Sequence, residues 1–111
     1  MLTDDLIEEI IRFRDERDWG QFHNPKDLAI SLSLEAAELL ENFQWASSDE
    51  AIQKRGGQIR DELADVLMLC VLMADAMDAD LAEIVKAKLK KNAEKYPVEK
   101  SFGRKEKYNE L

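Results

Sequence analysis

The fold of this chain is decided by EAAELLENFQW, residues 35–45, and by DELADVLMLCVLMADA, residues 61–76. In both stretches apolar residues recur every three or four positions, which is the period of a helix that buries one face. Each stretch also carries two acids three positions apart, Glu35 with Glu38 and Glu62 with Asp65. Residues at this spacing lie about one turn apart on one side of a helix. The sequence therefore predicts two helices that each present a pair of carboxylates.

Outward from these stretches, periodicity and helix-ending residues predict an all-α chain of four to five helices. Thr3 is expected to cap a first helix that runs to about Asp18, and residues 19–24 are expected to form a loop. Pro25 suits the first turn of a second helix, which runs to about Trp45.

Beyond the second helix, the residues SSDE at 47–50 are a new capping signal. They predict a short helix that stops near Gly56 and Gly57, and a long helix follows over about residues 58–77.

The end of the chain contains one more predicted helix. Asp78 or Asp80 caps it, it covers about residues 81–96, and Pro97 ends it because proline cannot continue a helix. Residues 98–111 are too polar to pack by themselves and are expected to form a C-terminal arm or flexible tail.

Composition narrows the class of protein. With 111 residues, of which 45% are hydrophobic and 36% charged, the chain is expected to form one globular domain over residues 1–97. The single cysteine, Cys70, excludes an internal disulfide and fits a reducing compartment. No signal segment opens the chain, and its longest apolar run is far shorter than the roughly 20 residues of a membrane helix. We expect a cytoplasmic protein that has no membrane partner.

Charge is distributed unevenly along the chain. Residues 1–84 carry 20 acidic and 7 basic residues, a net charge of −13, whereas residues 85–111 carry 4 acidic and 9 basic residues, a net charge of +5. Binding to a phosphate backbone needs a broad basic face, so nucleic acid is not an expected partner. A smaller anion, held by a few lysines and linked to carboxylates through a metal ion, remains compatible with this pattern.

Two helices are too apolar for a monomer of this length. The second helix has one apolar face that contains Leu28 and Leu39 and a second, nearly opposite face that contains Ile30 and Leu34. The long helix that follows is apolar almost all round between residues 63 and 74. Because four helices cannot cover all of these faces, we expect a homo-oligomer whose subunits share a helical bundle.

The acid pairs stand among these apolar residues. Asp65 is the only charge between residues 63 and 74. An isolated carboxylate in such a setting costs several kcal/mol, so it needs a basic partner, a hydrogen-bond network or a metal ion. Acids three apart also occur on solvated helix faces, and that interpretation stays open. Asp61 lies beside the pairs and is a further candidate ligand.

The ligand set favours a hard cation. Facing acid pairs offer only oxygen, which suits Mg²⁺ or Mn²⁺. The absence of histidine from both pairs counts against zinc and against a di-iron site.

Four ordered blocks of the sequence resemble the MazG-like, all-alpha NTP pyrophosphatases, and within them the dCTP pyrophosphatase branch. These blocks are RDWGQFHNP at 17–25, EAAELLENFQW at 35–45, DELADVL at 61–67 and KLKKNAEKYP at 88–97. The resemblance implies a magnesium site formed by Glu35, Glu38, Glu62 and Asp65, and dimers or tetramers with paired helices. It also implies a nucleoside triphosphate substrate whose phosphorus next to the sugar is attacked by water, with release of pyrophosphate. Glu38 is assigned by analogy as the residue that activates this water.

The resemblance also implies substrate-binding residues. The positions that contact the base in relatives match Trp19, His23 and Trp45. Along one side of the last predicted helix, the residues expected to receive phosphate oxygens are Lys88, Asn92, Lys95 and Tyr96. Two positions depart from the family, because Lys95 stands where relatives often have arginine and Leu69 stands where some relatives have tyrosine.

Two alternatives remain from the sequence. One alternative to the NTP pyrophosphatase is a non-catalytic helical module that binds nucleotides or assembles with itself, and the other is an enzyme of the same fold that acts on phosphoribosyl-ATP. The loop tryptophan and the FHNP segment at 22–25 fit the dCTP branch better than the second alternative.

Overall fold

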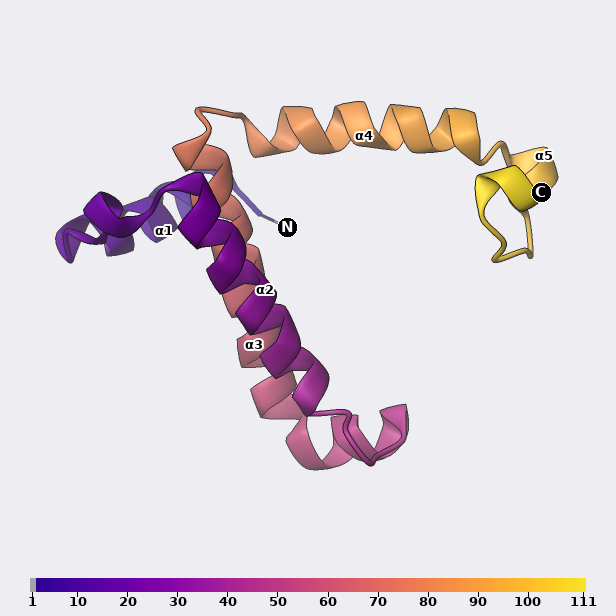
Figure 1. The fold of residues 1–111 in the computed structure, drawn as a ribbon, viewed down its shortest axis with the longest axis horizontal. Coiled ribbons are helices and arrows are strands. Elements are labelled where there is room, and N and C mark those ends of the chain that lie inside the picture. The colour runs from indigo at the N-terminus through magenta and orange to yellow at the C-terminus, as the bar shows by residue number, and fades with distance from the viewer. Residues whose placement is uncertain (1) are drawn as a thin grey trace. The chain divides into compact units, whose positions relative to one another are not determined.

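The computed structural model describes residues 2–111, and within that range every regular element is a helix (Figure 1). The all-α prediction is confirmed. The chain divides into two compact units, one ending at Ala79 and the other covering Asp80–Leu111. Within residues 2–111, none of the helices is both long and apolar enough to cross a bilayer.

The first helix, α1, covers Asp4–Glu16. It begins where predicted, because Thr3 Oγ1 accepts a hydrogen bond of 3.2 Å from the backbone N–H of Leu6. Asp4 and Asp5 lie in its first turn, where the helix dipole favours negative charge. Ile10 is the residue that α1 buries.

A single 3₁₀ turn, η1, covers Trp19–Phe22 and leads into α2, which covers Pro25–Glu41. Asn24 caps α2, since its Oδ1 accepts a hydrogen bond of 2.9 Å from the N–H of Asp27. The start at Pro25 is confirmed, but the helix ends before the predicted Trp45. The physical reason is a side-chain cap, because the amide of Asn42 donates to the carbonyls of the last turn. The backbone then turns into the left-handed region at Trp45, where φ is 61°.

The longest helix, α3, covers Ser48–Ala76. Ser47 caps it through a hydrogen bond of 3.2 Å from the N–H of Glu50 to Ser47 Oγ. The sequence predicts a short helix that stops near Gly56 and Gly57 and a long helix that follows. The structure agrees with this division, because Ser48–Ala76 is interrupted at Arg55, whose φ of −128° and ψ of 22° are not helical. The kink lies directly before the glycine pair, whose low helix propensity fits a break at this point.

The core of the first unit lies along the contact between α2 and α3, which run side by side as a hairpin (Figure 1). Leu28 and Val71 are each only 2% exposed, and Leu72 and Ala74 are also buried. Helix α1 packs against α3 and contributes Ile10 to this core. The hairpin brings the two acid-bearing stretches together in antiparallel order.

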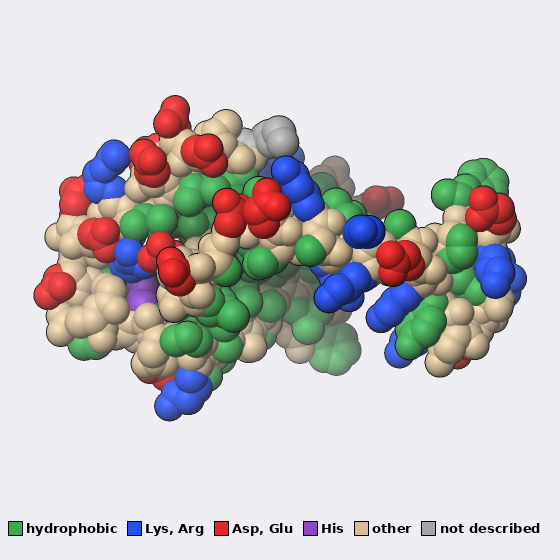
Figure 2. Space-filling model, turned by 90° about the horizontal axis from the view of Figure 1, so that it is seen from above, with side chains coloured by type: hydrophobic (Ala, Val, Ile, Leu, Met, Phe, Trp, Pro, Cys, Tyr) green, Lys and Arg blue, Asp and Glu red, His purple; other side chains and the backbone are tan. Residues whose placement is uncertain are grey.

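The other apolar face of α2 is open. Ile30 is 51% exposed, Leu34 61% and Leu40 70%, and Leu63 on α3 is 56% exposed. Figure 2 shows hydrophobic side chains in patches at the surface between charged ones. The sequence predicts that a second copy of the chain covers this face.

The second unit consists of α4, covering Leu81–Lys95, followed by the short helix α5, Val98–Ser101, and the 3₁₀ turn η2, Tyr108–Glu110. Asp80 caps α4 by accepting a hydrogen bond of 3.2 Å from the N–H of Glu83. Residues 98–111 turn back on the helix end, because the ring of Tyr108 meets that of Tyr96 edge to face at 6.2 Å.

Candidate functional site

The hairpin of α2 and α3 gathers four carboxylates. Glu35 and Glu38 come from α2, and Glu62 and Asp65 come from α3. The carboxylate of Glu35 is close enough to Glu38 on its own helix and to both acids of α3 for all three to act on its pKa. The structure therefore brings the two predicted acid pairs to one place.

The surroundings of Glu35 disfavour a charged carboxylate. Its pKa is raised above the ordinary value of a glutamate, mainly because burial removes solvent from the carboxylate. The hydrogen bond with Glu38 and the negative charges of Glu38, Asp65 and Glu62 raise the pKa further. The Oε2 atom of Glu35 is buried and has no hydrogen-bond partner. A buried carboxylate oxygen without a partner is unfavourable, so this atom is ready to accept a cation or a donor.

Glu62 is held by a residue that the sequence analysis missed. Asn42 is 5% exposed, and its Nδ2 donates a hydrogen bond to Glu62 Oε2. The same amide nitrogen donates to the carbonyl of Glu38 at 3.2 Å. Asn42 thus ties an acid of α3 to the end of α2. An amide between Glu41 and Phe43, close to the predicted end of the helix, was the signal in the sequence.

A pocket of about 320 Å³ opens beside the acids. Glu35 and Asp65 form part of its wall, together with Trp19 and His23. Its remaining lining comes from all three helices of the unit: Ile10, Phe13, Arg14, Ser31, Met68, Leu69 and Leu72. The Nδ1 atom of His23 is buried without a hydrogen-bond partner, like Oε2 of Glu35. Two unpartnered polar atoms therefore belong to residues that line one largely apolar pocket, a combination typical of ligand sites.

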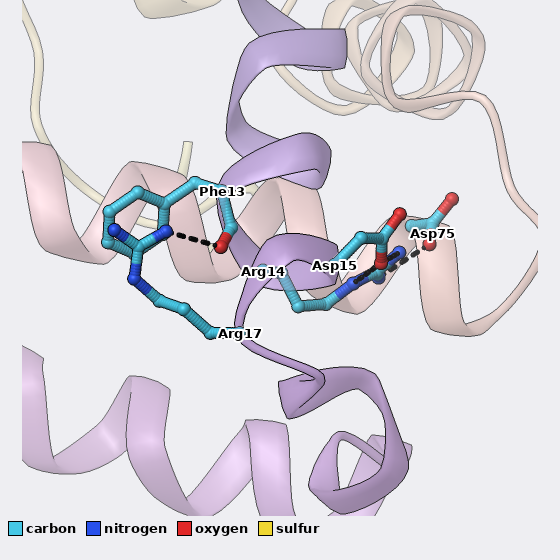
Figure 3. Close-up of polar contacts among 5 residues, drawn as sticks. All are labelled: Phe13, Arg14, Asp15, Arg17 and Asp75. Atoms are coloured by element: carbon cyan, nitrogen blue, oxygen red, sulfur yellow. Dashed lines mark hydrogen bonds and ion pairs between the residues drawn. The ribbon is translucent and has the colours of Figure 1, made fainter.

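On the aromatic side of this pocket, two rings and a guanidinium group are in contact. The rings of Phe13 and Trp19 meet edge to face with centroids 5.8 Å apart. The guanidinium of Arg17 lies 3.6 Å above the Phe13 ring, and its Nη1 donates to the Phe13 carbonyl at 2.9 Å (Figure 3). Trp19 nevertheless stays 44% exposed, so its ring surface is available for stacking.

The residues present fit a hard divalent cation. All four acids offer oxygen ligands, which a hard cation prefers. The charges of the other three acids disfavour a charged Glu35, and the buried Oε2 of Glu35 lacks a hydrogen-bond partner. Across residues 2–111, no three of the histidine, cysteine, aspartate and glutamate side chains already stand in the arrangement of a metal site. Binding a cation would therefore require the flexible glutamate side chains to rotate toward it.

The other predicted site residues lie away from this pocket or in the second unit. Trp45 is 94% exposed in the turn between α2 and α3, beside a separate hollow of about 260 Å³. The four predicted phosphate ligands lie on or at the end of α4. Among them, Lys95 Nζ lies 4.9 Å from the centre of the Tyr108 ring, a cation–π contact within the second unit.

Comparisons with known proteins agree with the resemblance in the sequence. Residues 30–111 match the model of the MazG-like family. The chain is 39% identical to the dCTP pyrophosphatase 1 of Mus musculus and 36% identical to that of Homo sapiens, in each case over 95% of this chain and 67% of the relative. Among solved structures, a pyrophosphatase from Archaeoglobus fulgidus is similar with a TM-score of 0.78 at 44% identity, covering 85% of this chain and 91% of that one.

Proposed function

The chain belongs to the MazG-like family, near the dCTP pyrophosphatases, and from this premise we propose that it hydrolyses nucleoside triphosphates to the monophosphate and pyrophosphate with the help of Mg²⁺. It is a nucleoside triphosphate pyrophosphatase. The finer part of the proposal is a deoxynucleotide substrate, with dCTP or a modified nucleotide as first candidate. Mn²⁺ is expected to substitute for Mg²⁺, since both prefer oxygen ligands.

One observation carries this proposal. Glu35 lies in the electrostatic field of the other three acids, and with its buried, unpartnered oxygen it lines an apolar pocket together with Trp19. A divalent cation relieves the repulsion among the acids, and a nucleotide base fills the pocket beside the aromatic ring. Neither feature is expected of a helical module that only assembles with itself.

In the proposed mechanism, Glu35, Glu38, Glu62 and Asp65 hold the cation. Bound Mg²⁺ supplies positive charge to the phosphate oxygens and offsets the charge that develops on them. Asn42 keeps Glu62 oriented through its hydrogen bond across the hairpin. Trp19 and His23 hold the base, by stacking and by hydrogen bonding from the imidazole.

Glu38 is proposed as the group that takes the proton from the attacking water. It is more exposed than the other three acids, so a water molecule can reach it from solvent. The water oxygen forms a bond to the phosphorus next to the sugar. The bond from that phosphorus to the bridging oxygen breaks, and pyrophosphate leaves with the bridging oxygen.

Two further parts of the proposal rest on the sequence resemblance. Lys88, Asn92, Lys95 and Tyr96 are proposed as phosphate ligands, and Trp45 as a contact to the base. The exposed apolar face with Ile30 and Leu34 is proposed to be covered by a second copy in a dimer or tetramer, because an open face of this kind is unfavourable in water.

The proposal is tested with a panel of ribo- and deoxynucleoside triphosphates and phosphoribosyl-ATP in the presence of Mg²⁺. We expect equal amounts of monophosphate and pyrophosphate from at least one nucleoside triphosphate. Glu35→Ala and Asp65→Ala should each lower turnover by about 100-fold or more, since even residues that only support metal ligands are worth about 10- to 100-fold. Glu41→Ala is the matched control, because this acid lies on α2 beside a different hollow. Release of single phosphate, or no turnover at all, would overturn the proposal.

A further inference from the structure

Arg14 joins three segments of the first unit at the pocket wall. It belongs to α1, and its Nη1 donates a hydrogen bond of 2.7 Å to Asp75 Oδ2 in the last turn of α3 (Figure 3). Its Nε donates at 2.9 Å to Asp15 Oδ1. The Arg14 side chain is only 13% exposed, and it lines the pocket that contains Glu35 and Trp19. Among the described residues up to Ala79, this is the only ion pair that links two helices.

The pair has a physical reason to be stable. Asp75 lies at the C-terminal end of α3, where the helix dipole disfavours a carboxylate. The Arg14 guanidinium neutralises that charge, and the hydrogen bond to Asp75 is the main reason why the pKa of Arg14 is raised. A planar guanidinium can serve both carboxylates at once, which the ammonium of a lysine cannot do with the same geometry.

The third segment is η1. Helix α1 and η1 lie against each other, and a Cβ added at Gly20 would lie 3.7 Å from Arg14 Nε and 3.9 Å from Arg14 Cδ, so Gly20 lies beside the Arg14 side chain. Gly20 follows Trp19, and its carbonyl accepts a hydrogen bond of 3.2 Å from the N–H of His23. None of the four residues of η1 is buried, so this turn has little packing of its own to fix it.

We propose that Arg14 is a positioning residue for nucleotide binding: by tying α1 to Asp75 and supporting η1, it holds Trp19 and His23 in place on the pocket wall. This inference rests on the proposed function, because the substrate is taken to bind beside Trp19. Both of its carboxylate partners lie outside the four-acid cluster, so the role proposed for Arg14 is to support the pocket wall and not to hold the cation.

The first readout is the environment of Trp19 without any nucleotide. The chain has two tryptophans, so a Trp45→Phe background leaves Trp19 as the only one. In that background, Arg14→Ala and Asp75→Asn are expected to increase acrylamide quenching of Trp19 and to shift its emission to longer wavelength. Arg12→Ala is the matched control, because Arg12 is an exposed arginine of the same helix that does not line the pocket. Unchanged quenching in folded Arg14→Ala protein would overturn the proposal.

The second readout is the split between KM and kcat in the chain with both tryptophans. Stacking of a base on an aromatic side chain is worth roughly 5- to 150-fold in affinity, so loss of positioning should raise KM about ten-fold. The value of kcat should stay within about three-fold, because the four carboxylates lie on α2 and α3. Arg14→Lys should recover part of the KM. A fall in kcat with an unchanged KM would contradict the proposal.

The two readouts distinguish a loss of positioning from a folding defect and from a failure of the proposed function. Circular dichroism identifies any variant that does not fold, and if Arg14→Ala is one of these, Asp75→Asn replaces it in both readouts. Because quenching is measured without nucleotide, it decides the placement of Trp19 even if the wild-type chain hydrolyses no triphosphate. Absence of wild-type turnover would instead overturn the proposed function.

Discussion

Asn42, at the end of α2, donates a hydrogen bond from its buried amide to Glu62 Oε2 on α3. The contact crosses the hairpin beside the acid cluster and fixes one carboxylate that is proposed to hold the cation. The same amide also donates to the carbonyls of Glu38 and Leu39, so it ends α2 and orients Glu62 together. One side chain therefore couples the local end of a helix to the geometry of the site.

Replacing Asn42 tests this coupling. Asn42→Ala leaves Glu62 without its donor and frees carbonyls in the last turn of α2, which should lower the free energy of unfolding by about 1–3 kcal/mol. Turnover should fall about 10- to 100-fold, because supporting partners of metal ligands have effects of that size. Urea unfolding and steady-state kinetics measure the two quantities. Gln44→Ala serves as control in the exposed turn that follows, and equal losses in both variants would show that the hydrogen bond to Glu62 has no special role.

The charge of Glu35 should destabilise the chain when no metal is present. Because the pKa of Glu35 is raised, the folded chain binds this proton more tightly than the unfolded chain does. The free energy of unfolding is then expected to fall as the pH rises from the ordinary range of a glutamate through the raised pKa. Glu35→Gln should remove this loss and stabilise the metal-free protein at neutral pH.

The measurement is urea unfolding in a chelator at several values between about pH 4 and pH 7. Glu41→Gln, a change of the same type at an exposed position of α2, provides the baseline. A Glu35→Gln protein that is less stable than the wild type at pH 7 would mean that another group already neutralises this carboxylate.

The core contact between α2 and α3 depends on Leu28. This side chain is 2% exposed, so Leu28→Ala should leave a cavity and lower the free energy of unfolding by about 2–5 kcal/mol. Chemical denaturation followed by circular dichroism gives the value. If the loss were below about 1 kcal/mol, the packing of α2 on α3 described above would not be the main source of stability.

The open face of α2 should control assembly. Leu34 is 61% exposed, and a charge at this position would be buried without a partner if a second copy covers the face. Leu34→Asp is therefore expected to shift the chain toward the monomer in size-exclusion chromatography with light scattering. Phe22→Asp, which places the same charge at an exposed apolar residue of η1, is the control. A wild-type chain that is itself monomeric would remove the basis for a shared bundle.

The local parts of the fold were predictable from the sequence because they depend on neighbours in the chain. Thr3, Ser47 and Asp80 cap helices through hydrogen bonds to residues three positions away, so their roles follow from spacing alone. The proximity of the two acid pairs could also be predicted, since the two acids of each pair lie on one helix face.

The remaining features depend on contacts between distant residues. Asn42 is separated from Glu62 by 20 positions and Arg14 from Asp75 by 61, and no periodicity links them. The early end of α2 was missed for a different reason: Asn42 donates to carbonyls only three and four positions back, but the apolar residues that continue to Trp45 suggested a longer helix. The predicted roles of Lys88 and Trp45 stay predictions.

The central claim is that the four carboxylates direct water to the phosphorus next to the sugar. The most direct measurement is hydrolysis of a deoxynucleoside triphosphate in ¹⁸O-labelled water with Mg²⁺, followed by mass spectrometry of the products. The account predicts one labelled oxygen in the monophosphate, none in the pyrophosphate, and labelling of the monophosphate about 100-fold or more slower with Glu35→Ala. Label in the pyrophosphate, or labelling by Glu35→Ala at the wild-type rate, would contradict it.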